Sequence, residues 1–136
     1  MRRLQYEQFK DPYLHIPDPW LSRYTTYAYQ DYIFKIFIPT EYPFHPPKIM
    51  CGKSDHIGYF AKKKMFFKSI IECYFPNFPC MCCCSKAHNW APSTTIHDIV
   101  LEYISYQMII RNVINTYLLQ SRLEIPELWR HIVSFL

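Results

Sequence analysis

Residues 32–49 read YIFKIFIPTEYPFHPPKI, and this stretch carries the strongest fold signal in the chain. Its first seven residues are β-branched or aromatic almost throughout, which predicts a central strand over residues 32–38 that ends at Pro39. Three prolines between positions 42 and 47 exclude a helix and remove backbone donors, so we expect a rigid, extended loop there. The aromatic residues 24–29 predict a strand before this segment, and residues 48–51 predict another after it.

A long helix is predicted further along the chain. Thr95, with Asp98 three residues later, has the pattern of a capping box, in which each residue bonds the backbone of the other. Apolar residues then recur at spacings of three and four from Ile96 onward, which predicts a helix to about Leu119. Between the last predicted strand and this helix, residues 73–92 are rich in proline and cysteine and are expected to be irregular.

Shorter helices are expected at both ends of the chain. Residues 1–10 predict a first helix, and Pro126 opens a last one within residues 121–136. Residues 125–136 also resemble the opening helix of an F-box, but a dozen residues are too few for that domain. Their apolar side chains are instead expected to pack on the core. Residues 52–73 are basic and aromatic, match no clear pattern, and look like an insertion.

Composition limits the possible classes of function. A chain of 136 residues makes one domain, and its two glycines lie in no phosphate-binding loop. The net charge of +4 is too mild to indicate nucleic acid. Lys62-Lys63-Lys64 lies among aromatic residues that could stack on bases, but a solvated insert with a buried aromatic underside is the more common arrangement, so no nucleic-acid partner is predicted.

Neither a membrane span nor a signal peptide is evident in the sequence. We therefore expect a reducing compartment, cytoplasmic or nuclear, and the amino-acid bias would also suit a viral protein in its host cell. In such a compartment the six cysteines indicate free thiols, metal ligands or catalysis rather than disulfides.

Two motifs in this order resemble those of the ubiquitin-conjugating enzymes. The family has a Tyr-Pro-Phe-x-Pro-Pro-Lys loop after a strand, as at residues 42–48. It also has a tryptophan motif that opens a helix after the catalytic cysteine, as at residues 90–96. The resemblance implies an α+β fold with an antiparallel meander sheet packed on a long helix, and with N- and C-terminal helices. The domain would span residues 1–120 with an insertion at about 52–73, and residues 121–136 would form the C-terminal helix.

The resemblance also implies site residues and partners. The catalytic cysteine lies eight or ten residues before the tryptophan in the family, which gives Cys82 or Cys80. The family has apolar residues directly after this cysteine, and Met81 after Cys80 is the better match, which favours Cys80 with Cys82 as the alternative. Asn77, in a Tyr-Phe-Pro-Asn sequence, corresponds to the family's oxyanion donor, although it stands closer to the cysteine than is usual. The implied partners are ubiquitin or a similar modifier, the activating enzyme and a ubiquitin ligase, with no cofactor and no metal. The residues that would bind these partners are Arg2, Arg3, Phe44, Ala91, Pro92 and Ser93.

Two alternatives stay open at this point. The first is a non-catalytic binding module of the same fold, as in RWD domains, which share the proline-rich loop. The second is a small zinc-binding protein. Cys80 and Cys83 have the spacing of a zinc knuckle, and either Cys51 with His56 or Cys73 with His88 could complete a tetrahedron.

Overall fold

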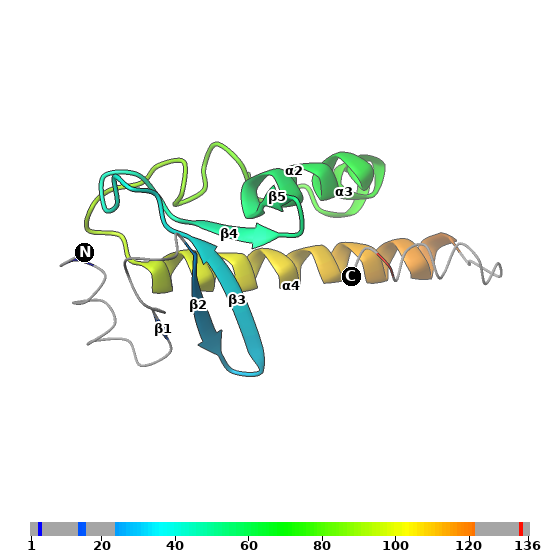
Figure 1. Cartoon of the computed structure of the whole chain (residues 1–136). Coiled ribbons are helices and arrows are strands. Elements are labelled where there is room, and N and C mark those ends of the chain that lie inside the picture. The colour runs from blue at the N-terminus through cyan, green and yellow to red at the C-terminus, as the bar shows by residue number, and fades with distance from the viewer. Residues whose placement is uncertain (1–2, 4–13, 16–23, 122–133, 135–136) are drawn as a thin grey trace.

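The protein is an α+β structure in the computed structural model, which describes residues 3, 14–15, 24–121 and 134. The described elements are β1 (Leu14–His15), β2 (Tyr24–Tyr29), β3 (Tyr32–Phe37), β4 (Lys48–Cys51), β5 (Ser54–Asp55), α2 (His56–Phe66), α3 (Lys68–Tyr74) and α4 (Ile96–Ser121). Figure 1 shows α4 running along the whole described body, with β4 and the pair α2 and α3 on one side and the β2–β3 hairpin crossing its N-terminal half.

The sheet is an antiparallel meander, the arrangement that the resemblance implies, and its three longer strands lie where the sequence predicts strands. Strands β1 to β4 pair in chain order, and the two-residue strand β5 pairs back onto β4. The β2–β3 hairpin turns through two residues, of which Gln30 adopts a positive φ of 54°. The β4–β5 turn contains Gly52 at a φ of 68°, a backbone conformation that glycine adopts at little cost.

The proline-rich loop between β3 and β4 turns tightly, so the prediction of an extended loop is wrong in that respect. The backbone N–H of Phe44 donates to the carbonyl of Glu41 over 2.7 Å, and that of Tyr42 donates to Pro39 over 3.1 Å. Proline removes donors at its own positions only, so the residues between the prolines can still close these turns. The loop contains neither helix nor strand, as expected, and its Tyr42-Pro43 peptide bond is cis.

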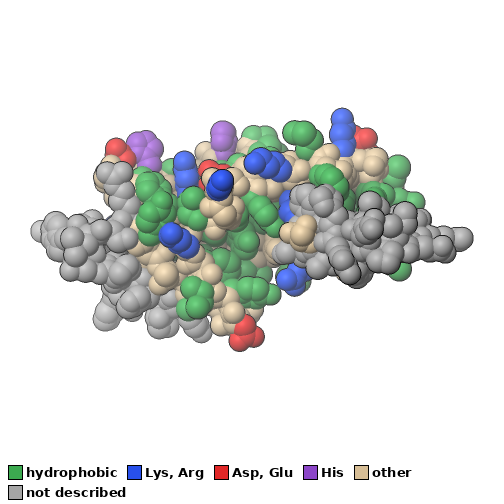
Figure 2. All heavy atoms as spheres, turned by 45° about the vertical axis from the view of Figure 1, so that its right-hand side comes forward, with side chains coloured by type: hydrophobic (Ala, Val, Ile, Leu, Met, Phe, Trp, Pro, Cys, Tyr) green, Lys and Arg blue, Asp and Glu red, His purple; other side chains and the backbone are tan. Residues whose placement is uncertain are grey.

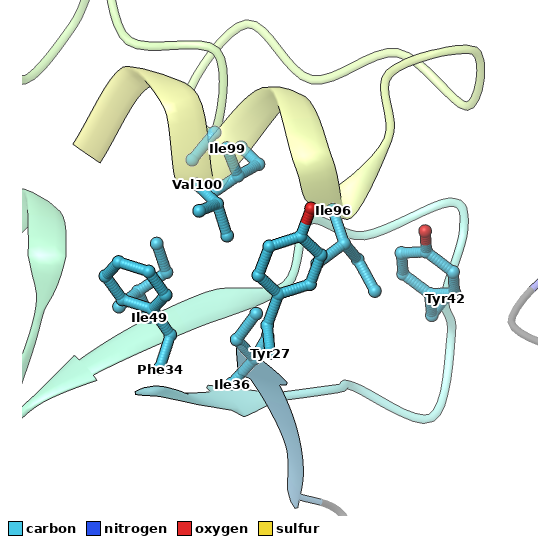
Figure 3. Packing of buried hydrophobic residues seen from close by; sticks show 9 residues of the cluster. Tyr27, Phe34, Ile36, Tyr42, Ile49, Ile96, Ile99 and Val100 are labelled. Carbon is cyan, nitrogen blue, oxygen red and sulfur yellow. The ribbon is translucent and has the colours of Figure 1, made fainter. Parts of the chain in front are cut away.

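Helix α4 begins with the predicted capping box. The Thr95 N–H donates to the Asp98 carboxylate over 2.9 Å, and the Asp98 N–H donates to the Thr95 hydroxyl over 3.2 Å. The first half of the helix packs its apolar stripe on the sheet, where Tyr27 and Ile99 are fully buried. Figure 3 shows the Tyr27 ring directed from the sheet toward the helix.

The second half of α4 packs on α2 and α3, two helices that the sequence analysis left unassigned. Asp55 caps α2 by accepting a hydrogen bond from the Gly58 N–H over 2.8 Å. The buried underside of the pair includes Phe60 and Phe67, at 0% and 2% exposure, in one cluster with α4. Lys63 is buried as well, at 4% exposure, so the run of three lysines does not present a continuous basic face.

The ends of the chain fall largely outside the described residues. The expected helices over residues 1–10 and 121–136 therefore stay predictions, and so does the placement of Arg2. None of the helices within the described part of the chain combines the length and the apolar character that crossing a bilayer requires.

Candidate functional site

The loop between α3 and α4 begins where proline ends a helix. Helix α3 ends at Tyr74, and Pro76 and Pro79 keep the following residues out of regular structure. Two side chains anchor the next part of the loop in the interior, Met81 at 1% exposure and Ser85 at 0%. The cysteines that lie next to these anchors are consequently held near the surface, since a short loop with two buried residues cannot also bury their neighbours.

Hydrogen bonds fasten this loop to α4 and to itself. The Lys86 N–H donates to both carboxylate oxygens of Glu102, over 3.1 and 2.9 Å. The Tyr106 hydroxyl, one helical turn further along, donates to the Cys80 carbonyl over 3.5 Å. The Asn89 side-chain amide donates to the Cys83 carbonyl over 2.8 Å. The backbone on both sides of the cysteines is therefore fixed relative to the helix.

Three thiols converge on this loop, and we call Cys80, Cys82 and Cys83 the thiol cluster. The Cys80 sulfur lies 3.0 Å from that of Cys83 and 3.5 Å from that of Cys82. All three sulfur atoms lie within 4.8 Å of one another. The structure thus brings together Cys80, its predicted alternative Cys82, and Cys83.

The local interactions shift the pKa values of two of these thiols in opposite directions. The contact with the Cys83 thiol lowers the pKa of Cys80 to about 5, with smaller contributions from the backbone of Cys82 and Cys84. The same contact raises the pKa of Cys83 to about 12, because its proton is held between the two sulfurs. Cys80 is therefore the thiolate of the pair at neutral pH, and the thiolate is the reactive form of cysteine.

Asn77, the predicted oxyanion donor, lies three residues before Cys80 on the same loop. Its side chain is exposed and lines a surface hollow of about 380 Å³ together with Phe78 and Asn112. Cys82 lines a different hollow, of about 320 Å³, whose walls include Met81 and are largely apolar. Asn77 and Cys82 therefore line different hollows of the surface.

The residues proposed to complete a zinc tetrahedron also lie elsewhere. His56 is buried, and its Nδ1 accepts a hydrogen bond from the Ile49 N–H over 3.2 Å. Cys51 interacts with Tyr103, and burial raises its pKa. Within the described residues, the group of possible metal ligands consists of Cys80, Cys82 and Cys83. Neither predicted pair, Cys51 with His56 or Cys73 with His88, belongs to it.

Those predicted partner-binding residues that the structure describes gather near the start of α4. The Trp90 indole N–H donates to the Pro43 carbonyl over 2.6 Å, and this bond joins the proline-rich loop to the segment before the helix. Phe44, next to Pro43, is 76% exposed, and residues 91–93, next to Trp90, are exposed too. Arg3 reaches the same segment, because its guanidinium donates to the Thr94 carbonyl over 3.4 Å.

Charge on the visible surface is dispersed. Figure 2 shows Lys and Arg side chains separated by hydrophobic ones on the face that it presents. The hollow beside Cys82 has Lys64 and Lys68 in its walls, and Lys68 forms an ion pair with Glu72 over 3.8 Å. The thiol cluster therefore has cationic side chains nearby without a large basic patch.

Sequence reasoning missed the residues that hold the loop in place. Met81 stands between two cysteines, and its burial, which the sequence does not reveal, fixes the thiols on either side. Glu102 and Tyr106 are four residues apart on α4, and this spacing, which places them on one helix face, was the available signal.

Comparison of the chain with protein-family models, with curated proteins and with solved structures gives no match. The fold and the site themselves define an α+β protein with a cluster of surface thiols on the loop that leads into its long helix.

Proposed function

We propose that this chain accepts ubiquitin or a similar modifier as a thioester on Cys80 and passes it to a lysine amine, with Cys82 as the alternative nucleophile. One observation carries the proposal. A partly exposed thiol, that of Cys80, lies on the loop between α3 and α4 that contains Trp90 and leads into the capped helix. Both motifs of the resemblance to ubiquitin-conjugating enzymes lie beside this loop.

The chemistry requires two exchanges at one sulfur. The Cys80 sulfur attacks the thioester carbonyl of the modifier on the activating enzyme, and the activating enzyme's cysteine leaves as the thiol. A lysine amine then attacks the new thioester, a C–N bond forms, the C–S bond breaks, and Cys80 is released. Neither step consumes a metal or an organic cofactor.

The surface near Trp90 supports a role with protein partners. Phe44 and residues 91–93 are exposed and are held side by side by the bond from Trp90 to Pro43. Exposed apolar residues that a fixed contact holds together are typical of docking sites. We assign ligase docking to this pair of loops, and docking of the activating enzyme to the N-terminal segment with Arg2 and Arg3.

A thioester assay tests the proposal. The protein is mixed with activating enzyme, ubiquitin and ATP, and the products are separated on a non-reducing gel. We expect an adduct that a thiol reductant removes, that Cys80→Ala abolishes and that Cys82→Ala retains. Cys73→Ala is the matched control, because Cys73 is an exposed thiol outside the cluster. Loss of the adduct in Cys82→Ala alone would move the nucleophile to Cys82.

The position of Asn77 favours a second candidate, a binding module of the same kind of fold without catalysis. Only residues 78 and 79 separate Asn77 from Cys80, a shorter gap than the resemblance implies for an oxyanion donor, and the Asn77 side chain is exposed. This candidate predicts that the folded protein forms no adduct on any of its cysteines in the same assay. Circular dichroism of the same sample establishes that it is folded.

A further inference from the structure

The thiol cluster contains more sulfur than a single nucleophile needs. Three thiols from four consecutive residues converge within 4.8 Å, while the two other exposed cysteines, Cys73 and Cys84, lie outside this group. Convergence of this kind needs the backbone to fold around a common point. Here Met81 is turned into the core and its two neighbours in the chain both lie on the surface side.

The spacing of the sulfurs suits a metal ion of ordinary size. A Zn–S bond of about 2.3 Å places the sulfurs of a tetrahedral site about 3.8 Å apart. The two shortest separations in the cluster are 3.0 and 3.5 Å, and every pair lies within 4.8 Å. Shifts of less than about 1 Å, within the reach of a change in cysteine rotamers, would therefore bring the sulfurs to ligand positions.

The surroundings of the sulfurs hold their backbone in place. The bonds from α4 and from Asn89 described above fix the loop on both sides of the cysteines, and contacts of this second layer orient ligating side chains. The hollow that Cys82 borders is lined by Lys64 and Lys68, of which Lys68 pairs with Glu72 over 3.8 Å, so the three side chains together leave one positive charge beside the cluster.

We propose that Cys80, Cys82 and Cys83 form a binding site for Zn(II), with three thiolate ligands and a fourth position that is open to an outside ligand. Thiolates select Zn(II) among the abundant divalent ions, and each thiol loses its proton when the bond to the metal forms. The inference does not depend on the proposed conjugation activity. If both hold, zinc on Cys80 prevents thioester formation, because one sulfur cannot serve as ligand and nucleophile together.

The test uses Co(II) and Zn(II) with the full, reduced protein and no other component. Co(II) bound to thiolates produces charge-transfer absorption in the near ultraviolet, and Zn(II) displaces it without absorbing. We expect one Co(II) per chain, displaced by one Zn(II). Cys80→Ser and Cys83→Ser should each weaken binding by at least about tenfold, because loss of an outer-layer partner alone costs about 10–100-fold in metal affinity and here a ligand itself is lost. Cys73→Ser, the matched control, should bind like the unmodified chain.

Several results would overturn the assignment. These are the absence of thiolate absorption with fully reduced cysteines, unchanged affinity in the Cys80→Ser and Cys83→Ser variants, or equal loss in Cys73→Ser. Binding of Cu(I) without any displacement of Co(II) by Zn(II) would also refute the choice of metal. Circular dichroism of each variant without metal separates loss of a ligand from loss of the fold. Because no activating enzyme is present, failure here leaves the thioester assay unaffected, and the reverse is also true.

Discussion

Truncation of Met81 tests whether the thiol cluster depends on a buried anchor. Met81 is 1% exposed and packs in the cluster that includes Phe60 and Tyr106. Met81→Ala removes three heavy atoms from that contact. At about 0.8 kcal/mol for each buried methylene-sized group, the lost transfer free energy is about 2.4 kcal/mol.

The hollow beside Met81 determines where the loss in the free energy of unfolding falls within the usual range for core Met→Ala changes. Core Met→Ala changes cost about 2–5 kcal/mol, and the upper values come from closed cavities that the protein cannot fill. Met81 borders a hollow of about 320 Å³ at the surface, so water can enter the space that the truncated side chain leaves. We therefore expect a loss of about 2–3 kcal/mol in the free energy of unfolding.

Urea unfolding followed by circular dichroism measures this loss in reduced protein. Met65→Ala is the matched control, because Met65 lines the same hollow but is 75% exposed, and its effect should stay within about 0.5 kcal/mol. Met81→Leu should retain most of the stability, since it keeps the apolar volume. Equal effects of Met81→Ala and Met65→Ala would refute the view that a buried methionine holds the cysteines.

Three further predictions concern the elements around the site. Trp90→Phe removes the donor to the Pro43 carbonyl and should lower the free energy of unfolding in urea by about 0.5–1.5 kcal/mol; no change would mean that the 2.6 Å bond does not form in solution. Ile99→Ala, at 0% exposure, should cost about 2–5 kcal/mol in the same assay, whereas Met108→Ala on the same helix, at 62% exposure, should cost little. Burial lowers the pKa of His56 below 6.5 in the folded state. At a pH between this lowered pKa and 6.5, the imidazole is therefore mostly protonated in the unfolded chain and mostly neutral in the folded one. Stability should therefore fall as the pH drops from about 7.5 toward the lowered pKa, and His56→Gln should flatten this dependence; an unchanged slope would assign it to another group.

Local pattern predicted most of the sheet and the long helix. Tyr32–Phe37 is β3 because aromatic and β-branched side chains fit a half-buried pleated strand. Thr95 and Asp98 cap α4 because they satisfy backbone groups within one turn, which requires no distant partner. The residues that form each of these signals lie close together in the chain, so the signals can be recognised from the sequence alone.

Helices α2 and α3 could not be assigned in the same way. Their apolar residues are mixed with lysines, and one of those lysines, Lys63, is itself buried at 4% exposure. The helical face becomes evident only against α4, where Phe60 lies 5.4 Å from the Tyr106 ring, centroid to centroid. The apolar pattern of α2 and α3 is hard to recognise in the sequence because long lysine side chains can cover apolar surface with their methylene groups.

The sequence by itself determined where β2, β3, β4 and the capped start of the long helix lie along the chain, and it indicated that the cysteine-rich segment before this helix contains the candidate site. It did so because strand propensity, proline and capping residues act on their near neighbours. Only the tertiary structure decided which sulfurs meet, since Cys80, Cys82 and Cys83 converge through the burial of Met81 and the bonds from the loop to Glu102 and Tyr106 on α4. Tertiary packing also placed Asn77 and Cys82 beside different surface hollows, because the direction of a loop between two prolines depends on what it packs against.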